Sequence, residues 1–322
     1  MSKNYSLSQA IKDKEEGLKH IKTCKIMFKC TPSYDEAIPY FKSAANNFKS
    51  EESFKEELFC REKLALCFQK TNSLWEEGNE HSNIARIYFN NIKDEDKGLK
   101  SIINAHNAFY NKGEYQDAIQ CIYKLALHLR IDYSKDYSKL EIIEKMLKVC
   151  YDSCLKFGHV VVSKEENEKD YIYKTFKLFF AVLIQLNKQD KAIEYSEILY
   201  KSLCAYEIDK TELFEIYFQK IIGLIINLDF NNKDLFEENI NECKNISEDR
   251  DDLQKLDALN TLVKAIISKN HKEFNDNLYE VGLSLDNELT KKLKDVFNRQ
   301  SEVIKNSDIQ IEMIKKNNQE FL

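Results

Sequence analysis

The sequence contains little of the two residues that interrupt regular secondary structure. Only seven glycines and two prolines occur among its 322 residues. Proline removes a backbone N–H, and glycine raises the entropic cost of ordering the chain, so their scarcity favours long helices. Hydrophobic residues make up 43% of the chain, which excludes disorder over most of its length.

Motifs of enzymatic and metal chemistry are also lacking. The chain has no G-x-x-x-x-G-K-[ST] phosphate loop, no H-E-x-x-H and no C-x-x-C, and its six histidines are dispersed. Cys150 and Cys154 share a helix face, but two thiolates do not make a structural zinc site, and core packing is the favoured interpretation. We therefore expect a non-catalytic protein without cofactor or metal.

Long apolar runs and a disulfide framework are missing as well. The longest apolar runs, Leu178–Leu186 and Ile221–Leu228, are too short to span a bilayer, and the N-terminus has no secretory signal. Nine cysteines at irregular spacing are typical of reduced core thiols in the cytoplasm. A net charge of −6 argues against nucleic acid as a partner, although Lys12–Lys29 is basic and Glu237–Asp257 is acidic.

A unit of about twenty residues recurs along the chain. An aromatic residue is followed three positions later by alanine and then by an apolar stripe at helical spacing, as at Tyr34 and Tyr115. Weaker copies begin near Phe54, Trp75, Lys97 and Asp190. Two such steps make a helical hairpin that must stack on its neighbours to bury both faces. The pattern predicts an all-α solenoid of about fourteen antiparallel helices.

The predicted domain organisation is a solenoid over residues 1–285 and a C-terminal helical segment with a tail over residues 286–322. Gly158–Lys169 is predicted to be an irregular loop. Amphipathic helices are predicted over Ser8–Cys24, Phe54–Lys70, Trp75–Phe89, Lys97–Tyr110, Tyr115–Arg130, Leu140–Phe157, Tyr171–Leu186, Lys191–Cys204, Thr211–Leu228, Lys233–Lys244, Asp251–Ser268, His271–Leu283 and Glu288–Lys305.

Several collinear motifs carry a family resemblance. Glu15–Ala45 contains E-G-L-x-H, an apolar segment and P-x-Y-D-x-A, and Phe54–Ala65 contains Cys-Arg-Glu. Together with Ser247–Leu262 and Tyr279–Leu285, these segments make the chain similar to the soluble NSF-attachment proteins, the gamma type most closely. The gamma-type glycine-rich acidic tail is absent here.

The resemblance implies a tetratricopeptide-like adaptor with three working surfaces. A loop near residues 24–33 would touch the membrane surface reversibly, a basic face would bind SNAREs, and the C-terminal region would engage the ATPase. The implied residues are, for the membrane, Ile26, Met27, Phe28, Lys25 and Lys29; for SNAREs, Lys93, Lys97, Lys100, Lys124, Arg130 and Lys139; and for the ATPase, Glu248, Asp249, Asp251, Asp252 and Leu322.

Each surface has an alternative interpretation. The apolar loop residues could fold back onto the following helix as a hydrophobic staple. Any of the lysines could be a solvated surface residue, and the acids beginning at Glu248 could complement a helix dipole.

The expected function is that of an adaptor in vesicle transport. It would bind the SNARE four-helix bundle, of syntaxin type and related, and recruit the hexameric AAA ATPase NSF for disassembly after membrane fusion. We expect a cytoplasmic protein peripherally associated with Golgi, vesicle, vacuolar or endosomal membranes. The alternative is a generic tetratricopeptide-like scaffold that binds helical or peptide segments of a multiprotein assembly.

Overall fold

The computed structural model describes residues 2–22, 31–133, 135–162, 170–204, 210–227, 233–246, 249–268, 270–282, 285 and 289–299. Within these ranges the chain is all-α, with no strand. It forms two compact units, which divide within helices α7 (Tyr137–Val162) and α8 (Asp170–Gln185). Unit one comprises Met1–Cys154 and Lys164–Thr175, and unit two comprises Leu155–Ser163 and Phe176–Leu322.

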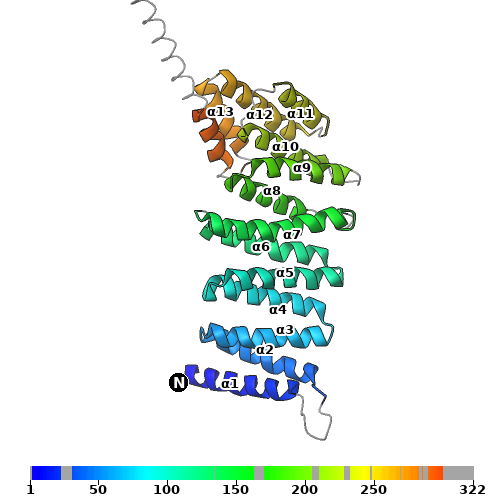
Figure 1. Ribbon diagram of the computed structural model, residues 1–322, viewed down its shortest axis with the longest axis vertical. Helices are drawn as coiled ribbons and strands as arrows, with labels where there is room; N and C mark the ends of the chain where they lie inside the picture. The colour runs from blue at the N-terminus through cyan, green and yellow to red at the C-terminus, as the bar shows by residue number, and fades with distance from the viewer. Residues whose placement is uncertain are drawn as a thin grey trace, which may run out of the picture. The chain divides into compact units, whose positions relative to one another are not determined.

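Unit one is a stack of helices in which each packs on the next in chain order (Figure 1). Its helices before α7 are α1 (Ser2–Ile21), α2 (Tyr34–Ser50), α3 (Phe54–Lys70), α4 (Leu74–Ile87), the π-helical turn η1 (Tyr88–Ile92), α5 (Glu95–Lys112) and α6 (Tyr115–Tyr133). Fully buried aromatic side chains such as Phe41, Phe48 and Phe89 fill the interfaces. The stacked-hairpin fold expected from the repeat is confirmed.

The forty-residue period expected from the repeat is present as contacts between alternate helices. Lys14 on α1 pairs with Glu56 on α3 at 2.7 Å, a separation of 42 residues. Trp75 on α4 and Asp117 on α6 are also 42 residues apart, and the indole Nε1 donates to the carboxylate at 3.2 Å. Side chains of one hairpin therefore contact the corresponding helix of the next hairpin.

Glycine permits close approach at two helix interfaces. A Cβ on Gly78 of α4 would lie 2.9 Å from the ring of Phe109, and one on Gly98 of α5 would lie 2.7 Å from Phe89. The Phe89 ring, in η1, is completely buried. These two glycines allow aromatic rings to fill the space that a side chain would occupy.

The transition from α4 to α5 departs from α-helical geometry. In η1 the Tyr88 carbonyl accepts from the backbone nitrogens of Lys93, at 2.7 Å, and Asp94, at 3.2 Å. Lys93 ends this turn with a left-handed backbone, at φ 62°. Asp94 then caps α5 by accepting from the Lys97 backbone nitrogen at 3.1 Å. The wide turn keeps both Tyr88 and Phe89 buried.

Unit two repeats the same stacking principle. Lys255 Nζ of α12 lies 3.1 Å from Glu215 of α10, 40 residues away, and 3.4 Å from Asp252. Tyr217, a buried residue of α10, donates its hydroxyl to Asn239 of α11 at 2.9 Å. Besides the ends of α7 and α8, the described helices of this unit are α9 (Gln189–Cys204), α10 (Lys210–Ile226), α11 (Lys233–Ile246), α12 (Arg250–Ser268), α13 (His271–Gly282) and the helical residues 289–299.

Two expectations about the organisation of the chain need comment. The loop predicted from Gly158 is wrong over its first five residues, because α7 continues to Val162. A single glycine costs a helix only about 1 kcal/mol, so a long helix can tolerate it. The predicted division into a solenoid over residues 1–285 and a C-terminal segment stays a prediction.

The cysteines in the described residues are unpaired thiols, most of them buried. Burial raises the pKa of the Cys60 thiol to about 12 and that of Cys67 to about 11. Such thiols are protonated at neutral pH and behave as small core residues. Among the helices of the described part of the chain, none combines the length and apolarity that crossing a membrane requires.

Candidate functional site

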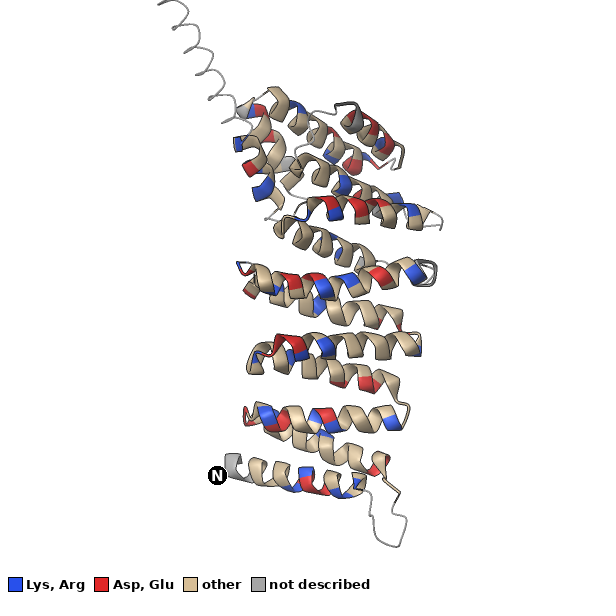
Figure 2. Cartoon of the chain, viewed as in Figure 1, with Lys and Arg blue, Asp and Glu red and all other residues tan. Residues whose placement is uncertain are grey.

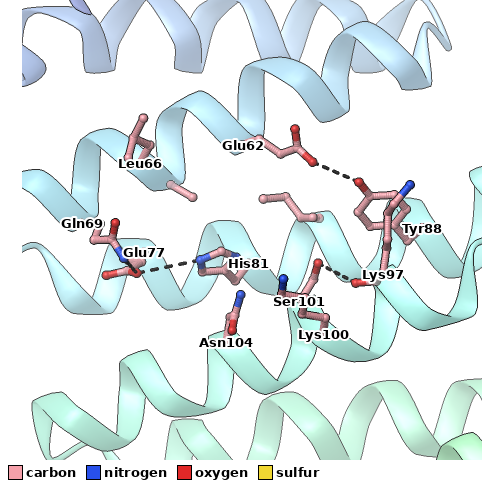
Figure 3. A pocket seen from close by; sticks show the side chains of 12 residues that line it. Glu62, Leu66, Gln69, Glu77, His81, Tyr88, Lys97, Lys100, Ser101 and Asn104 are labelled. Carbon is pink, nitrogen blue, oxygen red and sulfur yellow. Dashed lines mark hydrogen bonds and ion pairs between the residues drawn. The ribbon is translucent and has the colours of Figure 1, made fainter.

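A pocket of about 470 Å³ opens in unit one between α3, α4 with η1, and α5 (Figure 3). Because α3 and α5 flank α4 in the stack, α4 supplies the floor and the other two helices supply the walls. Leu66, Ala65 and Ile84 make its apolar surface. Its polar lining residues are Glu62, Gln69, Glu77, His81, Tyr88, Lys97, Lys100, Ser101 and Asn104.

One end of the pocket is built around Glu77 and His81, which lie one helical turn apart on α4 (Figure 3). Glu77 Oε1 accepts from Gln69 Nε2 at 3.4 Å and lies 3.8 Å from His81 Nε2. Burial raises the pKa of Glu77 and lowers the pKa of His81, because both charged forms are poorly solvated there. His81 Nδ1 is buried without a hydrogen-bond partner in the described structure.

Glu62, Tyr88 and Lys97 lie at the opposite end of the pocket, where their polar groups are already paired (Figure 3). The Tyr88 hydroxyl donates to Glu62 at 3.0 Å, and burial together with this bond raises the pKa of Tyr88 to about 12. Lys97 Nζ lies 2.9 Å from Asp94 and 5.7 Å from the centre of the Tyr88 ring. Each charge at this end therefore already has a partner within the chain.

Two of the α5 side chains that line the pocket, Lys100 and Asn104, have donor groups without a partner in the described chain. Lys100 is exposed, and Asn104 is one turn further along the helix. Neither side chain has an ion-pair or hydrogen-bond partner within the described ranges of the chain. Together with Glu77 and His81, they give the pocket both unused donors and unused acceptors. The arrangement suits recognition of a polar guest, and it contains no activated nucleophile.

The structure brings four of the six predicted SNARE-binding residues to the region where α5 and α7 begin. Lys93, Lys97 and Lys100 lie at or just before the start of α5, and Lys139 Nζ near the start of α7 is 3.6 Å from Glu95 of α5. Acidic residues interleave with these bases (Figure 2). Lys97 and Lys139 are therefore partly neutralised, whereas Lys93 and Lys100 are exposed without ion-pair partners among the described residues.

The other two predicted bases lie on α6. Lys124 is exposed, and its ammonium donates to Gln120 on the same helix at 2.8 Å. Arg130 is half-buried in the last turn of α6. The end of α6 does approach the group described above, because Lys139 Nζ lies 4.8 Å from the centre of the Tyr133 ring.

The predicted ATPase-binding acids that the structure describes differ in their exposure to solvent. Asp249 is exposed and caps α12, since its carboxylate accepts from the backbone nitrogens of Asp251 at 2.8 Å and Asp252 at 3.3 Å. Asp252 is only 2% exposed and pairs with Lys255, so its charge is used inside unit two. Asp251 is exposed. Glu248 and Leu322 lie outside the described residues.

The predicted membrane-contact residues, Ile26, Met27, Phe28, Lys25 and Lys29, also lie outside the described residues. Within the described ranges, no group of three or more histidine, cysteine and acidic side chains is placed to hold a metal ion.

Sequence reasoning missed the Glu77 end of the pocket, although a signal was present. Positions 77, 81, 84 and 88 follow helical spacing, and the last two are buried apolar or aromatic residues. Glu77 and His81 therefore lie on the same helix face as buried apolar residues. Burying polar side chains in an ordinary core is energetically unfavourable, so their position there is a signal of a binding site. In the repeat pattern they were indistinguishable from the many charged residues on helix surfaces.

Comparison with known proteins gave no match to any protein-family model or curated protein.

Proposed function

We propose that the protein is a non-catalytic adaptor that binds assembled SNARE four-helix bundles and recruits the hexameric AAA ATPase NSF for their disassembly. It would act at the surface of transport membranes through a reversible, peripheral contact. The motifs of Glu15–Ala45 and Phe54–Ala65 support this proposal, and the stacked helices provide a surface suited to binding another helical assembly.

The exposed lysines at the start of α5 are the observation that carries the SNARE-binding part. Lys93 and Lys100 flank Lys97 within one short segment, and neither has an ion-pair partner in the described structure. Such charges would speed the encounter with an acidic helix bundle and make it sensitive to salt.

The decisive experiment is capture of an assembled SNARE bundle by the full-length chain, followed by addition of the ATPase and ATP. Replacing both Lys93 and Lys100 by Glu should weaken capture at low salt by about tenfold or more, as expected for reversal of two charges at an electrostatically steered contact. Lys42→Glu is the matched control, because Lys42 is an exposed lysine of α2 in the same unit.

The outcome separates the adaptor from the alternative. Capture of the bundle together with ATP-dependent release supports the adaptor function. Failure to form a complex of all three components at low salt would leave a tetratricopeptide-like scaffold for helical or peptide segments as the better assignment. Equal losses in the control and the double variant would remove the α5 lysines from the contact.

A further inference from the structure

The Glu77 end of the pocket is deficient in hydrogen-bond donors. Glu77 is 8% exposed, yet within the described part of the chain its carboxylate receives only one long hydrogen bond, from Gln69 at 3.4 Å. The neighbouring His81 is held in its neutral form by burial, and its Nδ1 has no partner in the described chain. A neutral imidazole has one N–H and one acceptor nitrogen, so it cannot neutralise the carboxylate.

A buried carboxylate with so few hydrogen-bond donors is stabilised when a cation binds next to it. Burying a charge without a partner is unfavourable, and a guest that supplies both charge and donors removes that penalty on binding. A guanidinium or ammonium group has the required donors and no acceptor. Lys97 lies at the other end of the pocket, beside Tyr88, and within the described chain neither Lys97 nor Lys100 forms an ion pair with Glu77 (Figure 3).

The pocket also has features that select for a chain and not for a free cation. Leu66, Ala65 and Ile84 offer apolar surface on which the aliphatic stem of a long side chain can pack. Asn104 and Lys100, on the α5 wall, present donors that fit backbone carbonyl groups. An asparagine amide also accepts one hydrogen bond, and it therefore complements a whole peptide group.

We infer that this pocket binds an arginine or lysine side chain of a partner polypeptide, with its cation at Glu77 and its backbone at Asn104 and Lys100. Arginine fits best, because its planar fork can bind a carboxylate with two parallel bonds. This inference does not depend on the proposed SNARE contact, since the guest is basic and the side chain that selects it is acidic.

The test uses the full-length protein and short blocked peptides as probes. Acetyl-Ala-Arg-Ala-amide is titrated while the Ile84 δ1-methyl NMR signal, assigned with Ile84→Val, is followed. We expect saturable binding in the millimolar range, at least about fivefold tighter than for the same peptide with citrulline in place of arginine. Citrulline has nearly the same shape as arginine but carries no charge, so the ratio isolates the ionic contact.

The variants locate the contact. Glu77→Gln should reduce the arginine-to-citrulline ratio to about one, whereas Glu62→Gln should leave it unchanged, because the Glu62 carboxylate already accepts from Tyr88. Asn104→Ala should weaken both peptides to the same extent. Glu77→Gln removes a poorly partnered charge, so the variant is expected to fold, and its circular dichroism spectrum and melting temperature check this.

Three results would overturn the inference. The first is equal binding of the arginine and citrulline peptides. The second is retention of the preference in Glu77→Gln. The third is binding of free arginine amide as tightly as the peptide, which would contradict the assignment of a polypeptide guest.

Discussion

The indole nitrogen of Trp75 on α4 donates to the carboxylate of Asp117 on α6 at 3.2 Å, across 42 residues of sequence. This bond joins the first turns of two helices that occupy equivalent positions in successive hairpins. Because Trp75 is the single tryptophan of the chain, its indole N–H gives one NMR signal that reports on the stacking of these hairpins.

Asp117→Ala should move the Trp75 indole proton upfield, since the bond to a carboxylate is lost. The pair is exposed, so the free energy of unfolding should fall by less than about 1 kcal/mol. Asp96→Ala is the control, at an exposed acid in the first turn of α5. An indole shift that is the same in the wild type and in Asp117→Ala would show that the bond is not formed in solution.

Arg61 pairs with one buried acid, Glu57, and one half-buried acid, Glu80, of unit one. Its Nε lies 2.7 Å from Glu57 on α3, and its Nη1 lies 2.9 Å from Glu80 on α4. Arg61→Ala leaves both carboxylates without their partner and should lower the free energy of unfolding by about 3–5 kcal/mol. Arg86→Ala, at an exposed position on α4, should cost less than about 0.5 kcal/mol.

Chemical denaturation of the two arginine variants measures this difference. The Cys-Arg-Glu motif that contributed to the family resemblance thus contains a residue with a structural task between α3 and α4. A loss below about 1 kcal/mol in Arg61→Ala would mean that water or a shifted lysine solvates the two acids.

Gly98 on α5 makes room for the ring of Phe89. Its substitution by alanine places a Cβ 2.7 Å from that buried ring, so the two must separate. We expect a loss of about 1–3 kcal/mol from overpacking, partly offset by about 1 kcal/mol of higher helix propensity. In the Phe89→Leu background the same change should cost less, because a leucine leaves more space.

A double-mutant cycle on urea denaturation measures this coupling. If Gly98→Ala lowers the free energy of unfolding by the same amount with Phe and with Leu at position 89, the steric explanation is wrong.

One buried histidine, His106, and one half-buried histidine, His81, should make the fold sensitive to mild acid. Burial lowers the pKa of His81 and of His106, which contacts Ser153 on α7 at 3.1 Å. The unfolded chain then binds more protons than the folded chain below about pH 6.5, so stability falls as the pH drops below that value. Burial raises the pKa of Glu77, which acts in the opposite direction and at lower pH.

Melting temperatures between pH 7.5 and 5.5 test this expectation. The decrease on acidification should be smaller in His106→Gln than in the wild type, whatever the stability of the variant at pH 7.5. His128→Gln, at an exposed position of α6, should keep the wild-type pH dependence. An unchanged dependence in His106→Gln would show that His106 is protonated equally in the folded and unfolded states.

Much of the secondary structure was predictable because helix formation depends on local pattern. The prediction of Phe54–Lys70 coincides with α3, and the one for Asp251–Ser268 differs from α12 by a single residue. The apolar stripe has a period of 3.6 in each case, and polar or turn residues end it. The sequence predicts an irregular loop from Gly158, whereas α7 continues to Val162, because a single glycine does not stop a helix that packing supports.

The pocket could not be predicted to the same degree. Gln69 and Glu77 belong to different helices, and nothing in their local sequence shows that they lie 3.4 Å apart. The π-helical turn at Tyr88 has hydrogen bonds that span five residues, one more than in an α-helix. The burial of Tyr88 and Phe89 against neighbouring helices favours this turn. The grouping of Lys100 with Asn104 around His81 also depends on how three helices pack.

The sequence by itself determined the class of fold, since few helix breakers and a twenty-residue repeat of amphipathic segments leave stacked hairpins as the way to bury the apolar stripes. The tertiary structure decided which charges are used internally and which remain available. Asp252 is buried and paired with Lys255, and Lys97 is paired with Asp94, whereas Asp251 and Lys100 are exposed. The reason is physical: the burial of Asp252 and the pairing of Lys255 with Glu215 of α10, 40 residues away, depend on neighbouring helices, and a helical pattern in one segment does not contain them.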